Sequence, residues 1–223
     1  MSCAEEHGDH HGHGHDHGDH HGHSHEVPLS AGPNDSLYGV VDTPNVVALN
    51  AMDGGEAGQR AIKPWHEKED EGKYCESDAD DSLIIKIPFN ASVSLRSISI
   101  KAGPGGQTPS EMRLFKDAAG MDFSDAEAAE PAQMLEMVES TECVEYQVKA
   151  AKFAGITSLT LYFPGNTSDG EEDTTRVYYI GLRGKSAPLP QRPGIILYES
   201  AARPTDHKLE QKLMEGSSYR PGL

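Results

Sequence analysis

Apolar and polar residues alternate with a period of two through much of the chain, which predicts a series of short β-strands. The clearest run spans residues 83–89, where the odd-numbered residues are all apolar and Lys86 lies on the opposite face. Pro88 has no N–H for a strand ladder, so it predicts a strand end or a sheet edge at that point. Further strands are predicted at residues 93–100, 112–116, 144–148, 159–163, 177–182 and 195–198.

Several departures from simple alternation refine these elements. Val93 and Leu95 are out of phase with Ile98 and Ile100, which predicts a bulge near residues 96–97. Residues 177–182 are apolar on both faces, as in a central strand. Residues 112–116 read as a sheet edge that carries Arg113 and Lys116, and residues 134–137 fit either a strand or a short helix. Asp42 followed by Thr43-Pro44 predicts a short helix through Leu49.

About eight short strands joined by Gly/Pro turns, with few helices, are typical of an all-β sandwich. The low apolar content of the first residues predicts a disordered tail and linker over 1–36. A single domain is expected over 37–208, followed by a flexible Gly/Ser/Pro-containing tail over 209–223.

The charge balance narrows the choice of partner. The chain has 36 acidic and 19 basic residues, a formal net charge of -17. Such a charge repels phosphate backbones and anionic lipids, so neither nucleic acid nor a membrane is an expected partner. No apolar stretch long enough for a membrane span and no secretory signal is evident. The free protein is expected to be a monomer.

Three scattered cysteines, Cys3, Cys75 and Cys143, form no C-x-x-C pair. An odd number of thiols without a signal peptide indicates a reducing compartment, so the cytoplasm and also the nucleus are expected. No histidine or second thiol accompanies Cys75 or Cys143 in the sequence, and no G-x-S-x-G motif surrounds Ser110. The chain is therefore expected not to be an enzyme and to require no cofactor.

Residues 1–26, which we call the head, hold ten of the twelve histidines. Neutral imidazoles at short spacing in a flexible chain can bind Ni(II), Cu(II) or Zn(II). We interpret this affinity as incidental to a solvated tail, with metal buffering kept as an alternative function. The histidines with metal-binding spacing are His10, His11, His13, His15, His17, His20, His21, His23 and His25.

An acidic turn, residues 76–81, precedes the strand at 83–89. A calcium site would need six to eight oxygen ligands from a tightly turned loop, and no turn glycine or closing glutamate is present. We therefore expect Ser77, Asp78 and Asp80 to accept hydrogen bonds from backbone N–H groups of the turn.

Three blocks of this sequence together resemble the PITH domain family. They are Glu76–Asp81 with Ile87–Phe89, Pro109–Lys116, and Asp173–Gly184, and residues 201–208 are similar to the closing motif of the family. The resemblance implies a jelly-roll sandwich similar to galactose-binding-like domains. The family is best known from the C-terminal half of a thioredoxin-like protein that associates with the 26S proteasome. No thioredoxin half precedes the domain here, so the chain resembles a stand-alone PITH protein, and reductase activity is not implied.

The resemblance therefore implies a non-catalytic adaptor or regulator of the 26S proteasome that contacts its regulatory particle. The alternatives are the metal buffer and a lectin-like module with Trp65 as its aromatic platform. Candidate partner contacts are the shared charged positions of the family blocks and closing motif: Glu76, Asp78, Asp80, Glu111, Arg113, Asp173, Arg176, Arg183 and His207.

Overall fold

A computed structural model describes residues 33–189 of the protein. The histidine-rich head, the predicted strand at 195–198, His207 and the C-terminal tail lie outside the described residues.

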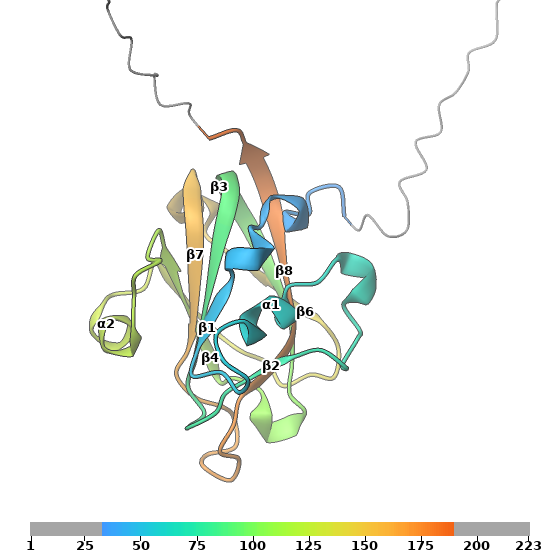
Figure 1. Ribbon diagram of the computed structural model, residues 1–223, viewed down its shortest axis with the longest axis vertical. Coiled ribbons are helices and arrows are strands. Elements are labelled where there is room, and N and C mark those ends of the chain that lie inside the picture. The colour runs from blue at the N-terminus through green and yellow to red at the C-terminus, as the bar shows by residue number, and fades with distance from the viewer. Residues whose placement is uncertain (1–32, 190–223) are drawn as a thin grey trace, which may run out of the picture. The chain divides into compact units, whose positions relative to one another are not determined.

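Two antiparallel layers face each other and share one long strand, β3 (Leu83–Ala102), which takes part in both (Figure 1). In the first layer, the start of β3 pairs with β1 (Val47–Leu49) and β7 (Ile156–Phe163), and the order continues to β4 (Glu111–Lys116) and β5 (Gln133–Glu136). In the second, the rest of β3 pairs with β6 (Val144–Gln147) and β8 (Arg176–Ala187), and β8 also pairs with β2 (Cys75–Glu76). The predicted jelly-roll β-sandwich is confirmed.

Strand β3 changes layers where its pairing is interrupted. Its register with β7 breaks between Pro88 and Val93, and its register with β8 shifts between Leu95 and Ser97. The second irregularity is the bulge that the phase slip predicts. The strand does not end at Pro88, so the strand-end alternative was wrong. Instead, the loss of one backbone donor coincides with the bend between the layers.

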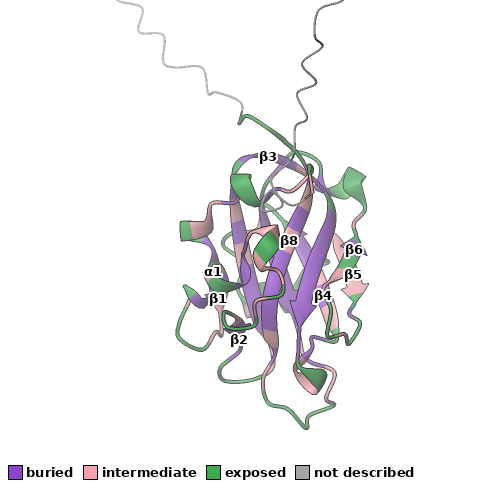
Figure 2. Ribbon diagram, turned by 90° about the vertical axis from the view of Figure 1, so that its right-hand side faces the viewer, coloured by how far each residue is buried: buried purple, intermediate pink, exposed green. Residues whose placement is uncertain are grey.

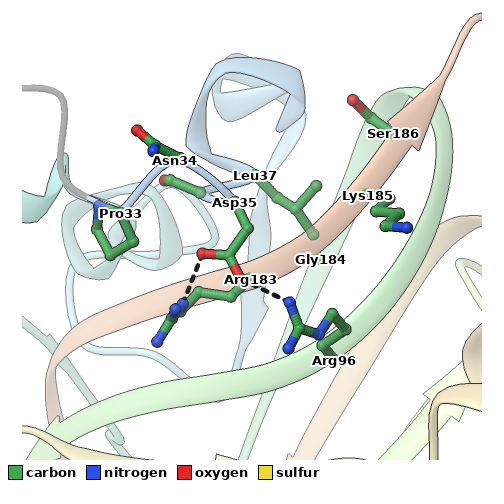
Figure 3. A pocket seen from close by; sticks show the side chains of 10 residues that line it. Pro33, Asn34, Asp35, Leu37, Arg96, Arg183, Gly184, Lys185 and Ser186 are labelled. Carbon is green, nitrogen blue, oxygen red and sulfur yellow. Dashed lines mark hydrogen bonds and ion pairs between the residues drawn. The ribbon is translucent and has the colours of Figure 1, made fainter. Parts of the chain in front are cut away.

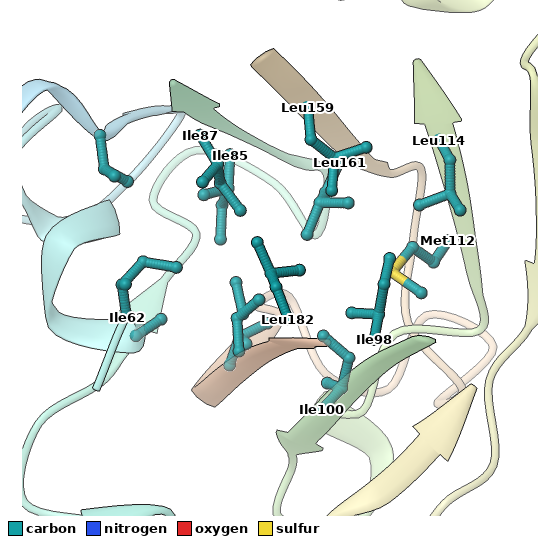
Figure 4. Packing of buried hydrophobic residues seen from close by; sticks show 14 of the residues in the cluster. Ile62, Ile85, Ile87, Ile98, Ile100, Met112, Leu114, Leu159, Leu161 and Leu182 are labelled. Carbon is teal, nitrogen blue, oxygen red and sulfur yellow. The ribbon is translucent and has the colours of Figure 1, made fainter. Parts of the chain in front are cut away.

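The core lies between the layers and is built from their inward-facing aliphatic side chains (Figure 4). Ile85, Ile87 and Leu161 project from the first layer, opposite Ile98 and Leu182 of the second. These side chains are at most 4 % exposed. Figure 2 shows the same contrast along the strands, with buried positions on the sheets and exposed ones in the loops.

A second apolar cluster covers the outer face of the first layer. Ile84, Phe115 and Tyr162 pack there beneath α2 (Phe123–Ala128), which contributes Ala126. Asp122 caps this helix by accepting the Asp125 N–H, and the Asp125 side chain accepts the N–H of Asp122. This capping box is a sequence signal for the start of a helix that our reading of the sequence missed.

The remaining helices are short and lie in the connections. The structure has one further α-helix, α1 (Ala57–Ala61), and the 3₁₀ turns η2 (Tyr38–Val40), η3 (Thr43–Asn45), η4 (Trp65–Glu67), η5 (Gly105–Gln107) and η6 (Ala150–Phe153). Within residues 33–189, no helix has the length and apolar content that crossing a membrane requires.

Three other expectations about elements change. The helix predicted through Leu49 is only the η3 turn, because the β-branched residues that follow enter β1 and pair with β3. Strand β4 lies between β5 and β7, so Arg113 is not on a sheet edge, whereas Lys116 lies beyond the pairing with β5 and pairs with β7 alone. Residues 134–137 adopt the strand alternative, as β5.

Residues 177–182 of β8 are buried on both faces as predicted, apart from the half-buried Gly181, but strand pairing covers little of the outer edge of β8. There β2 supplies two residues, and the chain before η2 supplies a bridge between Ser36 and Arg183. Leu37 N–H donates to Leu182 C=O, and Gly184 N–H donates to Asp35 C=O. Asp35 and Ser36, which lie in the predicted linker, therefore pair with the sandwich.

Gly184 permits β8 to approach β3 closely at the bulge. A Cβ at this position would lie 2.2 Å from the backbone oxygen of Ser94. We expect Gly184→Ala to destabilise the protein by about 1–3 kcal/mol, because the backbone of one strand must move. Equilibrium urea unfolding measures this change in free energy. Gly39→Ala is the matched control, since a Cβ there meets nothing within 4 Å. Equal midpoints for both variants would contradict the argument.

Candidate functional site

The three sequence blocks meet at one end of the sandwich. Strand β2 belongs to the first block and pairs with the start of β8, which belongs to the third block. Glu76 therefore lies opposite Arg176. The second block joins through a bridge between Pro109 and Asn166 and through Ser110 N–H, which donates to Gly165 C=O. Positions widely separated in the sequence thus form one group of loops. We call it the loop end and define it as residues 76–82, 103–111 and 165–176.

An ion pair between Glu76 and Arg176 lies at the centre of the loop end. The Arg176 Nη2 and Nε atoms lie 2.9 and 3.1 Å from Glu76 Oε2, and Thr174 Oγ1 donates to Oε1 at 3.0 Å. The guanidinium also lies 4.6 Å from the centre of the Tyr74 ring. Burial opposes the charge, but hydrogen bonds to Tyr178 and Glu76 and the attraction of Glu76 raise the pKa of Arg176. Arg176 is therefore a permanent cation in this pair.

In the acidic turn, backbone N–H groups donate to two of the three residues expected to accept them, but only the donor to Asp80 lies at the turn, whereas the donor to Ser77 is Thr175 in the loop before β8. Ser77 Oγ accepts the Thr175 N–H at 2.9 Å, and Asp80 Oδ1 accepts the Ser82 N–H at 2.9 Å. Asn50 Nδ2 donates to the same Asp80 oxygen at 2.8 Å. Asp78 differs, because its carboxylate is exposed and accepts no hydrogen bond from the described residues.

Asn166 ties the remaining loops to the turn. Its backbone N–H donates to Asp81 Oδ2, and its Nδ2 donates to the carbonyls of Glu172 and Thr174. Gly106 packs against the same loop, where an added Cβ would lie 2.8 Å from Ser168 Cβ. Asn50, Asn166, Thr174 and Tyr74 were missed as candidates, because single Asn and Thr residues after strands are common in any loop.

The other candidate residues fall into separate places. Glu111 pairs with Arg113 at 2.6 Å, and the Arg113 guanidinium lies 5.5 Å from the centre of the Tyr162 ring. Asp173 is exposed at the loop end. Arg183 lies farther along β8 and pairs with Asp35 and Glu145. His207 and the nine candidate metal-binding histidines lie outside the described residues.

The described residues show little that favours thiol, metal or sugar chemistry. Burial raises the pKa of Cys75 to about 12 and that of Cys143 to about 11, so both are protonated near neutral pH. Within residues 33–189, no group of three or more His, Cys, Asp or Glu side chains is arranged to hold a metal ion. Trp65 is half-buried, and the Lys68 ammonium lies 4.3 Å from the centre of its ring.

A family model described as the PITH domain matches residues 28–202. The chain belongs to the PITH domain family. A PITH domain-containing protein of Drosophila melanogaster is 38 % identical over 209 residues, which cover 92 % of this chain and 96 % of the relative. PITH domain-containing protein 1 of Homo sapiens is 36 % identical over 202 residues, or 90 % and 94 % of the two chains. Family membership supports a protein-interaction module.

Solved structures with a similar fold are more distant from this PITH domain. The family 32 CBM from Clostridium perfringens NanJ, in complex with galactose, has a TM-score of 0.47 at 8 % identity. It is matched over 97 % of its length and over 66 % of this chain. The C-terminal domain of a chitobiase from Bacteroides fragilis has a TM-score of 0.42 at 14 % identity, over 98 % of its length and 71 % of this chain.

Removing the central cation should destabilise the PITH domain. In Arg176→Leu the Glu76 carboxylate, whose side chain is 9 % exposed, loses its partner. We expect a loss of about 2–3 kcal/mol, below the roughly 3–5 kcal/mol of a fully buried pair, because the Arg176 side chain is 23 % exposed. Urea unfolding measures the loss. It should shrink in a Glu76→Gln background, where no charge is stranded.

The exposed pair of Arg60 and Asp53 provides the control for this prediction. Its side chains are 46 % and 61 % exposed, so Arg60→Leu should cost less than about 1 kcal/mol. Equal losses for Arg176→Leu and Arg60→Leu would show that burial of the Glu76–Arg176 pair contributes nothing.

Proposed function

We propose that this PITH domain is a non-catalytic adaptor that binds the regulatory particle of the 26S proteasome through its loop end. The observation that supports this most is the meeting of the three family blocks there. Their buried polar groups are bonded to one another, which fixes the backbone of the loops before any partner binds. A surface fixed in this way avoids much of the ordering cost of association.

The charge of the loop end indicates what kind of surface it would meet. Asp78 and Asp173 are exposed, as are Asp169, Glu171 and Glu172 in the neighbouring loop. Neither Asp78 nor Asp173 forms an ion pair with another described residue. Carboxylates at the rim of an interface accelerate association with a basic surface and select against acidic ones. The loop end is thus suited to a cationic protein surface.

Other properties of the domain are compatible with an adaptor in the cytoplasm and nucleus. Cys75 and Cys143 are free thiols, as is usual in a reducing compartment. Their raised pKa values disfavour thiolate chemistry of the kind that thioredoxin-like proteins perform.

Reversing the loop-end charges should weaken the proposed association. We expect Asp78→Lys combined with Asp173→Lys to lower the affinity for purified 26S proteasome by about tenfold, because like charges would then face each other. Co-sedimentation at near-physiological salt measures the bound fraction. The matched control is Glu127→Lys combined with Glu130→Lys, which makes the same charge change at exposed positions outside the loop end.

The outcomes separate the partner from the surface. If the unmodified chain does not co-sediment, the proteasome is not its partner. If it co-sediments and both double variants bind equally well, the contact lies elsewhere than at Asp78 and Asp173.

A further inference from the structure

A second polar surface lies beside the other end of β8, in a groove of about 840 Å³. One wall is the segment from Pro33 to Leu37, and the other is the last part of β8, from Arg183 to Ser186. Arg96 projects into it from β3 (Figure 3). We call this site the β8-edge groove.

The floor of the β8-edge groove is a strand edge that is only partly used. Gly184 N–H donates to Asp35 C=O, so the backbone groups of Gly184 face the outer edge of β8, away from β3. Because these groups alternate along a strand, the C=O of Gly184 and the N–H of Ser186 face the same outer edge. No described backbone group outside the β3–β8 ladder is bonded to either of them. An extended chain can therefore add to β8 at this point.

The side chains around this edge are cationic. Two guanidinium groups share the single carboxylate of Asp35: Arg183 Nε lies 2.8 Å from Oδ1, and Arg96 Nη1 lies 3.1 Å from Oδ2 (Figure 3). The Lys185 side chain is exposed and has neither a hydrogen bond nor an ion pair with any described residue. The Arg96 side chain is 61 % exposed, and Nη1 is its only atom bonded to a described residue. The groove thus has more N–H donors than acceptors.

Asp35 shows which chemistry suits these donors. The hydrogen bond from Arg183, together with the attraction of Arg183 and Arg96, outweighs partial burial and lowers the pKa of Asp35. A carboxylate on a main chain paired with β8 is therefore stabilised here. The remaining donors of Arg96, on β3, and of Lys185, on β8, lie beside this edge and would hold further carboxylates in the same way.

We propose that the β8-edge groove binds an extended acidic peptide of a partner protein. The peptide pairs its backbone with Gly184 and Ser186 and places carboxylates on Arg96 and Lys185. The acidic character follows from charge complementarity, because the three cations Arg96, Arg183 and Lys185 outnumber Asp35 and Glu145, the two carboxylates that pair with Arg183. Arg183 lies seven positions after Arg176 on β8, roughly 23 Å along the strand. The inference therefore does not rest on the loop end or on the proposed function.

The probe is a fluorescein-labelled ten-residue peptide of alternating Glu and Val, titrated with the full chain and followed by fluorescence anisotropy. We expect saturable binding that weakens as salt rises. Lys185→Glu should weaken peptide binding about tenfold and removes no partner of Asp35. Arg96→Glu should also weaken peptide binding about tenfold. Lys116→Glu, an exposed cation on β4, is the matched control and should leave binding within about twofold.

Two further probes test how the peptide binds. The same peptide N-methylated at every residue lacks all backbone donors and should bind about tenfold more weakly if it pairs with β8. A peptide of alternating Lys and Val should not bind measurably. Far-UV circular dichroism of each protein variant establishes that it is folded, so a loss of binding is not a loss of structure.

Several outcomes would overturn the inference. They are no binding of the acidic peptide at about 1 mM, equal binding by the Lys peptide, or binding unaffected by Lys185→Glu and Arg96→Glu. If a single-stranded oligonucleotide displaced the labelled peptide more strongly than the unlabelled peptide does, the groove would be assigned to nucleic acid. A dimer that is lost in Lys185→Glu would assign it to a second copy of the chain. Tighter peptide binding when the six acids of residues 1–26 are replaced by amides would assign it to the head.

Discussion

One strand has to supply the core from both layers, and most of the architecture depends on this constraint. Strand β3 packs Leu83, Ile85 and Ile87 from the first layer and Ile98 and Ile100 from the second into one cluster. A regular strand of this length would carry its apolar stripe away from the core. The break after Pro88 and the bulge after Leu95 bend the strand and reset its phase, so burial continues on both sides of the bend.

This bend also determines where the polar groups can gather. Strands β2, β7 and β8 take their positions by pairing directly or indirectly with β3, so their loops arrive together at the loop end. Burying Glu76 there would be costly without a partner, because a desolvated carboxylate that lacks a cation destabilises the fold. Arg176 and Thr174 bond to it and the Tyr74 ring lies against Arg176, and the network they form holds the loops in one arrangement. The exposed acids are then carried on a framework that does not have to be ordered by a partner.

The sequence predicted the features that depend on local pattern. Alternation located most of the strands, the phase slip near Arg96 located the bulge, and the family blocks marked the positions that form the loop end. It failed where distant pairing decides the outcome. Pro44 begins only one helical turn, because Val47 pairs with β3. Arg113 lies inside the sheet, because β5 covers β4. The β8-edge groove could not be predicted, since the Asp35–Arg183 pair spans 148 residues.

The two ends of β8 carry opposite chemistry on one rigid element. At Arg176 the cation pairs with Glu76 and the exposed groups nearby are acids. At Arg183 the cation pairs with Asp35 and Glu145, and the cationic donors of Arg96 and Lys185 remain. Pairing along β3 fixes the separation of the two ends, so a single large partner could meet both with no change in the domain. Two weak contacts held at a fixed distance reinforce each other, because binding at one raises the effective concentration at the other. A domain with an acidic surface at one end and a cationic groove at the other can thus select a partner by the spacing of two complementary patches.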